Sequence, residues 1–207
     1  MSARARVVRE DVEASGDVGV TWTSSLTGVG RLTRMERLEL DPGGDARALG
    51  VWTFAEVTNA REVCERVRRG EVGACVMDAS VVVGRRQLRV AGYRAATARA
   101  RGDALATSDA GELACAVSPT RHVREAYRRF GPRETSVALV VCRLDPTPED
   151  EAAVLALVRG RLASFDERGA VDEGSIRKWY KINDEELALG GTLEDAVISR
   201  MAIRDVV

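Results

Sequence analysis

The chain alternates between short apolar stretches and segments with helical spacing, and this succession predicts a domain of strands and helices. Residues 34–40 and 49–57 flank a turn with the sequence Asp-Pro-Gly-Gly-Asp, which predicts an antiparallel hairpin. Residues 136–144 form a continuous apolar run rich in β-branched side chains, the pattern of a central strand covered on both faces. Further short apolar stretches lie at 74–83 and at 113–117, and we interpret the second as a strand.

Apolar residues at helical spacing predict four helices before the last thirty residues, over 59–69, 85–101, 122–130 and 148–162. Gly92 interrupts the second of these helices, and its small residues Ala91, Ala95 and Ala98 indicate close approach of another element. A polar loop is expected over 166–175. The mixture predicts an α/β (α+β) fold, a single domain in which a mixed sheet packs with helices.

The chain of 207 residues is long enough for one substantial core but short for two full domains. Residues 1–33 combine charged residues with Ser, Gly and Thr and show no clear period. We therefore expect residues 1–33 to be a flexible or loosely docked extension, and residues 34–207 to form the domain.

The last thirty residues end in an amphipathic helix that begins after Gly190 and Gly191. Thr192 is its expected N-cap, and acidic residues follow in the first turn. Its apolar residues are Leu193, Ala196, Val197, Ile198, Met201 and Ile203. This stripe is too wide to be left in water, so the helix either completes the protein's own core or docks onto a partner. Both hold if one side packs inward and the other meets a partner.

The formal net charge is −1 at pH 7, so no overall field favours nucleic acid or a membrane, although a local basic face remains possible. Only Lys178 and Lys181 among the 31 basic residues are lysine, and the rest are arginine. Arginine binds phosphate in a two-pronged geometry that lysine lacks. Biased codon usage also explains the excess, since Ala, Gly and Val are abundant too.

The four cysteines, Cys64, Cys75, Cys115 and Cys142, are scattered without a close pair and read as reduced core thiols. Their spacing does not fit a zinc site, and we expect no metal and no cofactor. No secretory segment and no apolar stretch of membrane-spanning length is evident. The expectation is an intracellular protein without a membrane partner.

Catalytic signatures are weak. Gly28-Val29-Gly30 lacks the rest of a nucleotide-binding loop, and His122, the single histidine, falls in the first turn of a helix among arginines. Cys142 falls in the buried strand, where a thiol behaves as a small apolar group. The acidic run 184–186 is typical of a helix first turn. These residues indicate a protein that is not an enzyme and has no small-molecule substrate.

Three collinear blocks carry a family resemblance. The first is the terminal segment, with Tyr180, Lys181 and Ile182 before a turn and then Leu193, Asp195, Ala196, Val197, Ile198, Arg200, Met201, Asp205 and Val206. The others are residues 54–70, with the sequence Val-Thr-Asn-Ala followed by Val63, and residues 118–142, which combine Ser-Pro, an amphipathic helix, Phe-Gly and a buried strand. Together they resemble the kinase-binding subunit family of the KEOPS (EKC) complex, known as TPRKB or PRPK-binding protein. The resemblance covers residues 34–207 as a TPRKB-like domain.

The resemblance implies a non-catalytic accessory subunit. Such a subunit binds the small lobe of the PRPK-type atypical kinase of KEOPS directly and the other KEOPS subunits indirectly. It helps to recruit tRNA by its acceptor end for threonylcarbamoyl-adenosine modification next to the anticodon. A location in both cytoplasm and nucleus is the corresponding expectation.

Two sets of residues are candidates for these contacts. For kinase binding we predict the terminal helix and the first helix, through Leu193, Val197, Met201, Ile203, Val63 and Val67. For tRNA binding we predict arginines on the helix 122–130 and a second cluster on the helix 85–101, namely Arg121, Arg124, Arg128, Arg129, Arg85 and Arg89. Each cluster taken alone also fits solvated surface charge.

Two alternatives stay open at this point. A free-standing tRNA-binding protein would bind tRNA strongly without the kinase and with a steep salt dependence. A small α/β enzyme with an unrecognised site would show a deep pocket with perturbed acid or base groups.

Overall fold

The computed structural model describes residues 20–27, 31–40, 47–188 and 191–204. Within these residues one sheet has the strand order β1-β2-β3-β5-β4, with β6 also paired to β3, and every pairing is antiparallel. The strands are β1 (Val20–Thr27), β2 (Arg31–Glu39), β3 (Ala48–Ala55), β4 (Cys75–Asp78), β5 (Leu139–Leu144) and β6 (Arg161–Ala163). The predicted hairpin is confirmed as β2 and β3.

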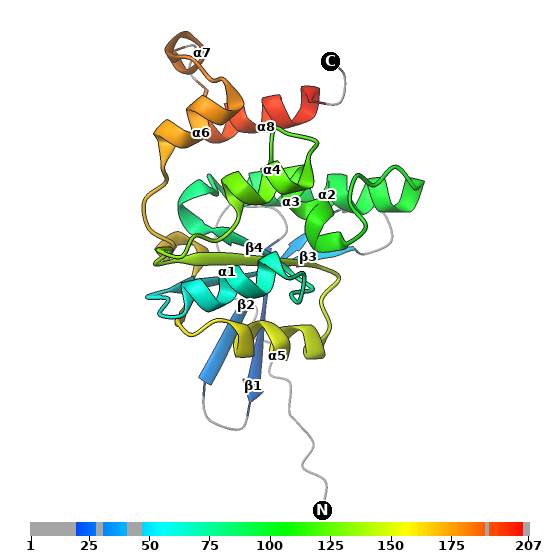
Figure 1. The fold of residues 1–207 in the computed structure, drawn as a ribbon, viewed down its shortest axis with the longest axis vertical. Coiled ribbons are helices and arrows are strands. Elements are labelled where there is room, and N and C mark those ends of the chain that lie inside the picture. The colour runs from blue at the N-terminus through cyan, green and yellow to red at the C-terminus, as the bar shows by residue number, and fades with distance from the viewer. Residues whose placement is uncertain (1–19, 28–30, 41–46, 189–190, 205–207) are drawn as a thin grey trace, which may run out of the picture.

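Helices cover both faces of the sheet, and a further layer of helices lies outside one of them (Figure 1). The face covered by α1 (Ala60–Arg68) and α5 (Pro148–Leu157) is opposite the face covered by α2 (Arg85–Arg101), α3 (Asp109–Val117) and α4 (Val123–Phe130). The outer layer consists of α6 (Glu173–Tyr180), α7 (Asp184–Ala188) and α8 (Leu193–Ile203). The α+β class expected from the sequence is confirmed.

Each face of the sheet has its own hydrophobic core. Side chains alternate across a strand, so neighbours in β3 separate: Val51 joins the core under α2 and α3, and Trp52 joins the core under α1 and α5. In β5, Val140 and Val141 divide in the same way. The prediction that residues 136–144 supply a strand covered on both faces is therefore confirmed for Leu139–Leu144.

The helix α2 is continuous through Gly92, contrary to the expected interruption. Ala91 and Ala95 are fully buried, and a Cβ at position 92 would approach the Leu40 side chain to 2.8 Å. Glycine is needed here because the helix lies directly against the sheet, so the close approach expected from the small residues is confirmed.

Three other predictions differ from the structure. Residues 113–117 belong to the helix α3, because a short apolar run does not distinguish a strand from a buried helix. Ser108 begins this helix by accepting a hydrogen bond from the Gly111 amide. Helix α5 ends at Leu157, and Leu162 lies in β6. The expected loop 166–175 contains the first residues of α6, capped by Asp172.

Part of the expected amino-terminal extension belongs to the sheet. Strand β1 pairs with β2 from Val20 opposite Leu38 to Thr27 opposite Arg31. This pairing differs from the expectation that residues 20–27 and 31–33 are loosely docked, since each residue of β1 has a partner across the ladder. Residues 1–19 and 28–30 lie outside the described residues.

A buried carboxylate joins the sheet to α2 and to the segment before α6. Glu36 in β2 is 3% exposed and accepts hydrogen bonds from the Arg85 guanidinium at 2.7 and 3.1 Å and from the Phe165 amide at 2.9 Å. Arg85 also binds both oxygens of Asp166, and its guanidinium carbon lies 4.8 Å from the Phe165 ring centroid. Burial of a carboxylate costs little folding free energy only when partners such as these form hydrogen bonds with it.

The outer layer is attached to the same end of α2. Gly84 precedes α2 and has no capping side chain. Instead, the Glu194 carboxylate of α8 accepts a hydrogen bond from the backbone N–H of Gln87 at 3.0 Å. Arg86 forms an ion pair with Asp195 at 2.7 Å. A Cβ at position 84 would collide with the Glu194 carboxylate, so glycine leaves the space that this contact between helices needs. The Tyr180 hydroxyl of α6 donates to the Val117 carbonyl of α3.

Substitution of Glu36 by Ala is expected to lower the free energy of unfolding by about 3 kcal/mol or more, because it removes the buried partner of Arg85 and leaves the Phe165 amide without its acceptor. Urea denaturation followed by circular dichroism measures this change. The control is Arg61→Ala, since the Arg61 side chain is 76% exposed and its surface ion pairs are expected to contribute less than about 1 kcal/mol. Equal effects of the two substitutions would contradict the assigned role of Glu36.

Candidate binding surfaces

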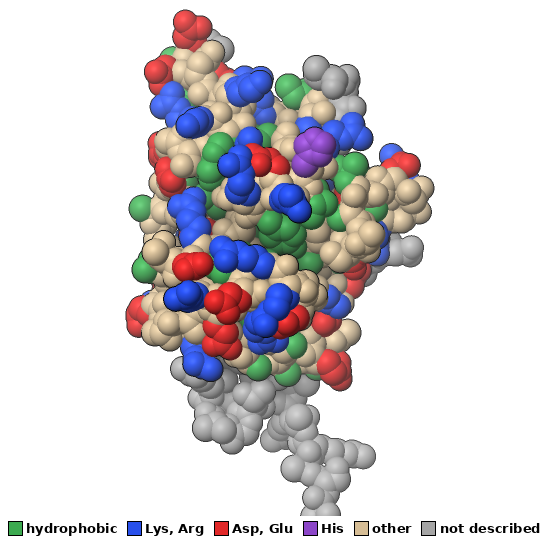
Figure 2. Space-filling view, viewed as in Figure 1, with side chains coloured by type: hydrophobic (Ala, Val, Ile, Leu, Met, Phe, Trp, Pro, Cys, Tyr) green, Lys and Arg blue, Asp and Glu red, His purple; other side chains and the backbone are tan. Residues whose placement is uncertain are grey.

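A groove with basic side chains around an apolar floor lies between α1 and α4. It has a volume of about 870 Å³. The lining residues are Cys64, Val67, Arg68, Gly70, Arg124, Tyr127, Arg128, Pro132, Arg133, Glu134 and Thr135. Figure 2 shows this face of the molecule, with hydrophobic side chains in a central hollow and basic side chains around it.

Helix α4 holds the upper side of the groove because its two faces differ. Ala126 and Phe130 are fully buried, and Phe130 contacts the rings of Trp179 and Tyr180 in α6 at centroid distances of 5.4 and 6.0 Å. The spacing of four residues places Arg124 and Arg128 on the same outward face. Packing of the inward face thus fixes where these two cations lie.

Tyr127 contributes an aromatic surface to the groove. Its side chain is half-buried, and burial raises the pKa of its hydroxyl above the ordinary value. The hydroxyl therefore stays neutral near pH 7, and the ring can offer a flat apolar surface to a base or a side chain.

Two of the predicted arginines on α4, Arg128 and Arg129, form ion pairs with the same acidic residue, Glu125. Glu125 accepts from Arg128 at 2.6 and 2.7 Å and from Arg129 at 2.6 Å. The hydrogen bond from Arg128, with that from Arg129, lowers the pKa of Glu125 to about 2. In the part of the chain that the structure describes, the Arg124 and Arg133 side chains have no ion pair, so they are the less compensated cations of the groove.

The six predicted tRNA-binding arginines lie at different places on the structure. Arg124 and Arg128 line the groove, and Arg129 is held beside it on Glu125. Arg121 lines a different cavity, against α2 and the end of α8. Arg89 is half-buried on α2 and has an interaction within the protein. The six residues therefore do not form one surface.

The environment of Arg85 differs from the exposed position that a tRNA contact requires. Its side chain is only 23% exposed and is held by Glu36 and Asp166. Although burial acts to lower it, hydrogen bonds to these two carboxylates raise the pKa of Arg85 above its usual value. A guanidinium held in this way is a structural link between strand and helix, and this arrangement does not favour the predicted contact of Arg85 with tRNA.

The predicted kinase-binding residues differ in how far they are buried. Val197, Met201 and Val63 are fully buried in the protein's own cores, which corrects their assignment to an exposed docking surface. Leu193 and Val67 are half-buried against those cores, and Val67 lines the groove. Ile203 is 46% exposed. The stripe on α8 therefore completes the core, and the part of the prediction that concerns Ile203 and Leu193 stays a prediction.

Two lining residues of the groove, Arg68 and Arg133, were missed from the sequence. Arg68 ends α1 and Arg133 follows Gly131-Pro132, so they are far from Arg124 and Arg128 along the chain. The basic residues in the last turn of α1 were a local signal, but it also fits a favourable interaction with the helix dipole. Only the fold brings α1 and α4 to the same groove.

The thiols are poorly suited to nucleophilic chemistry. Burial raises the pKa of Cys75 to about 12 and that of Cys115 to about 11, and it also raises the pKa values of Cys64 and Cys142. Near pH 7 these groups stay protonated, whereas a nucleophile or metal ligand needs the thiolate.

No group of three or more His, Cys, Asp or Glu side chains among the described residues is arranged to hold a metal ion. No described helix is long and apolar enough to cross a membrane.

A groove that combines fixed cations with an apolar floor is typical of the surfaces that binding modules use. Comparison with known proteins specifies the module. Residues 54–205 match the family described as Kinase binding protein CGI-121, and the chain belongs to this family. The family is one of non-catalytic binding subunits, so the protein is not an enzyme.

Two curated relatives agree with this assignment. The protein is 31% identical over 156 residues to the EKC/KEOPS complex subunit TPRKB of Danio rerio. It is 29% identical over 176 residues to the EKC/KEOPS complex subunit CGI121 of Gibberella zeae. Each alignment covers 74% of this chain and 89% of the relative. The resemblance noted in the sequence is therefore confirmed.

Burial of α8 generates a prediction about charged substitutions. Val197→Asp is expected to lower the free energy of unfolding by about 3 kcal/mol or more, because it places a carboxylate in an apolar core without a partner. Ile203→Asp on the same helix is expected to change the free energy of unfolding by less than about 0.5 kcal/mol. Thermal and urea unfolding of the two variants measures the difference, and a stable Val197→Asp protein would contradict the packing of α8.

Proposed function

We propose that this protein is a non-catalytic accessory subunit of the KEOPS complex. In this role it binds the small lobe of the PRPK-type kinase and helps to recruit tRNA for threonylcarbamoyl-adenosine modification next to the anticodon. The observation that carries the proposal is the family match over residues 54–205. Both relatives are named as KEOPS complex subunits, which supports it.

The groove between α1 and α4 supports the tRNA part of the proposal. Arginine side chains bind phosphate by paired hydrogen bonds, and unpaired bases stack on aromatic or guanidinium surfaces. The groove offers both features, with Arg124 and Arg133 at its rim and Tyr127 in its lining. We therefore assign the tRNA end to this groove, and we leave Arg85 out of the interface.

Charge reversal at the groove tests this assignment. Arg124→Glu combined with Arg133→Glu is expected to weaken tRNA binding about tenfold or more at 0.1 M salt, because repulsion replaces two phosphate contacts. Fluorescence anisotropy with labelled tRNA measures the dissociation constant. The slope of its logarithm against the logarithm of salt concentration should also fall in magnitude by about 1 to 2.

Arg159→Glu is the matched control, since that side chain is 73% exposed and lies outside the groove lining. It is expected to change tRNA affinity by less than about threefold, through the long-range field alone. If the groove variants and the control weaken binding equally, the groove is not the tRNA surface.

Removal of the acidic neighbour should act in the opposite direction. Glu125→Gln leaves Arg128 and Arg129 without their shared carboxylate, which makes both guanidinium groups available to phosphate. The expected result is tRNA binding about two- to fivefold tighter, measured by the same anisotropy titration. Unchanged or weaker binding would show that these arginines do not face the RNA.

A free-standing RNA-binding protein is the second candidate, and the groove favours it as much as it favours a KEOPS subunit. The kinase distinguishes the two. The KEOPS proposal expects a stable complex that co-elutes with the PRPK-type kinase of the same organism. The second candidate expects strong tRNA binding and no such complex.

A further inference from the structure

The two edges of the sheet are formed by strands of different kinds. β4, at one edge, has four residues, and all of them are buried. β1, at the other edge, has eight residues and pairs only with β2 among the described strands. Its sequence contains no charged residue and no proline, whereas five of the nine residues of β2 are charged. Charged residues and proline normally protect an open edge from pairing with another chain, so β1 is an edge without this protection.

The hydrogen bonds of the sheet show which backbone groups of β2 are directed to β1. In an antiparallel pair, residues that exchange two hydrogen bonds alternate with residues that exchange none. The Leu40 amide donates to the Arg47 carbonyl at 3.0 Å, in the same register that sets Leu38 opposite Leu49. The even-numbered residues at this end of β2 therefore bond to β3, and the odd-numbered residues bond to β1.

The register of β1 on β2 carries the same alternation to the outer edge. Odd-numbered residues of β1 lie opposite odd-numbered residues of β2, as Thr23 lies opposite Met35. Their N–H and C=O groups are therefore used in the ladder between these two strands. The residues whose N–H and C=O groups point to the open side of β1 are Val20, Trp22, Ser24 and Leu26.

This row of outward backbone groups is complementary to itself. Two antiparallel copies of β1, related by a two-fold axis at Thr23, would place Val20 opposite Leu26 and Trp22 opposite Ser24. All the outward groups of both strands then have partners, which gives about eight backbone hydrogen bonds between the copies. Because β1 is uncharged, the two-fold axis brings no like charges together within the strand pair.

We propose that β1 is a self-association surface, through which two copies of this chain join their sheets edge to edge into one continuous antiparallel sheet. The contact goes beyond the proposed role in KEOPS, because β1 lies outside residues 54–205, which match the family. Each copy has one such edge, since the residues of β4 are buried. Pairing therefore closes as a dimer and does not continue into a filament.

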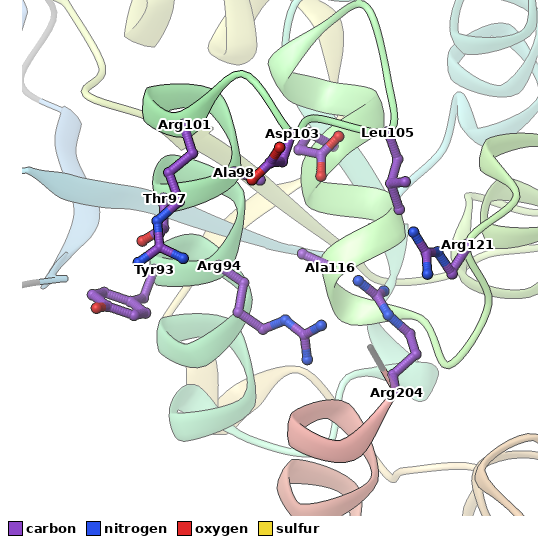
Figure 3. A pocket seen from close by; sticks show the side chains of 11 residues that line it. Tyr93, Arg94, Thr97, Ala98, Arg101, Asp103, Leu105, Ala116, Arg121 and Arg204 are labelled. Carbon is purple, nitrogen blue, oxygen red and sulfur yellow. The ribbon is translucent and has the colours of Figure 1, made fainter. Parts of the chain in front are cut away.

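Self-association at β1 leaves the other surfaces of the molecule open. The hairpin of β1 and β2 extends from the end of the molecule opposite α6 and α8 (Figure 1). The lining of the groove between α1 and α4 begins at Cys64, and that of the cavity between α2 and α3, which Figure 3 shows, begins at Tyr93. Neither lining includes a residue of β1 or β2, so the dimer does not use the surfaces described above.

Measurement of the molar mass of the full chain by light scattering, over a range of concentrations, tests the proposal. The expected species is a dimer. Ser24→Pro is expected to weaken this dimer about tenfold or more, because proline removes an N–H that points to the second copy and puts its ring there. Ser24→Thr is the matched control, since it keeps the N–H, and its dissociation constant should stay within about twofold of that of the wild-type protein.

Cysteine cross-linking tests the register of the two strands. Thr23→Cys places the two thiols at directly opposite positions across the two-fold axis, where a Cα separation of about 4.5 Å suits a disulfide. Mild oxidation should then give a covalent dimer on non-reducing electrophoresis. Ser25→Cys should not, because the proposed register separates its two copies by four residues, or about 13 Å along the strand. The wild-type protein, whose four cysteines are buried, gives the background.

A dimer that is weakened by Ser24→Pro and cross-linked at position 23 but not at position 25 supports the proposal. A monomeric full chain overturns it, and a dimer that appears only when residues 1–19 are removed would assign the edge to the chain's own preceding segment. A dimer that is not cross-linked at position 23 uses another surface and also overturns it. If Ser24→Pro separates β1 from β2, cross-linking at position 23 decides, because Thr23→Cys keeps every N–H of the strand.

Discussion

The positions of the helices relative to the sheet depend on one buried carboxylate, which must form hydrogen bonds with groups from several parts of the chain. Glu36 reaches its three hydrogen bonds only if α2 begins beside β2 and if the chain returns to the same place at Phe165. This condition fixes the start of α2 relative to the sheet. The start of α2 in turn receives Glu194 and Asp195 of α8, so the position of the outermost helix follows from a contact in the second strand. An apolar core alone would tolerate sliding of these layers, whereas directed hydrogen bonds between charged groups do not.

The same arrangement explains why the terminal helix has two roles. Its inward side chains, Val197 and Met201, supply part of the core over α2 and α3, and this burial stabilises the outer layer. Near its end, Ile203 remains exposed. The family match therefore concerns a segment that is first a structural element, and the side chains left for a partner are the ones that the core does not use.

The helices and strands could be predicted from the sequence more completely than the binding surfaces. Periodicity gave α1, α2, α4 and the strands β2, β3 and β5 with small errors at their ends, because each of these elements has one clear pattern of apolar residues. It failed for residues 113–117, where every residue is buried and the pattern loses its period. Charge was harder to interpret, because Arg85 and Arg124 look alike in sequence. The first is held by a carboxylate 49 residues away and the second faces a groove. Arg68 and Arg133 could be grouped with Arg124 only after folding.

Phe130 has a consequence for the geometry of any larger assembly. Its ring joins α4, which carries the groove arginines, to Trp179 and Tyr180 of α6, and α6 in turn contacts α8. The groove is therefore connected to the outer helices α6 and α8 by continuous packing of side chains. A molecule bound in the groove and a second molecule bound over the outer helices would be held at a set distance and angle, so the protein would act as a spacer that determines how its partners face each other.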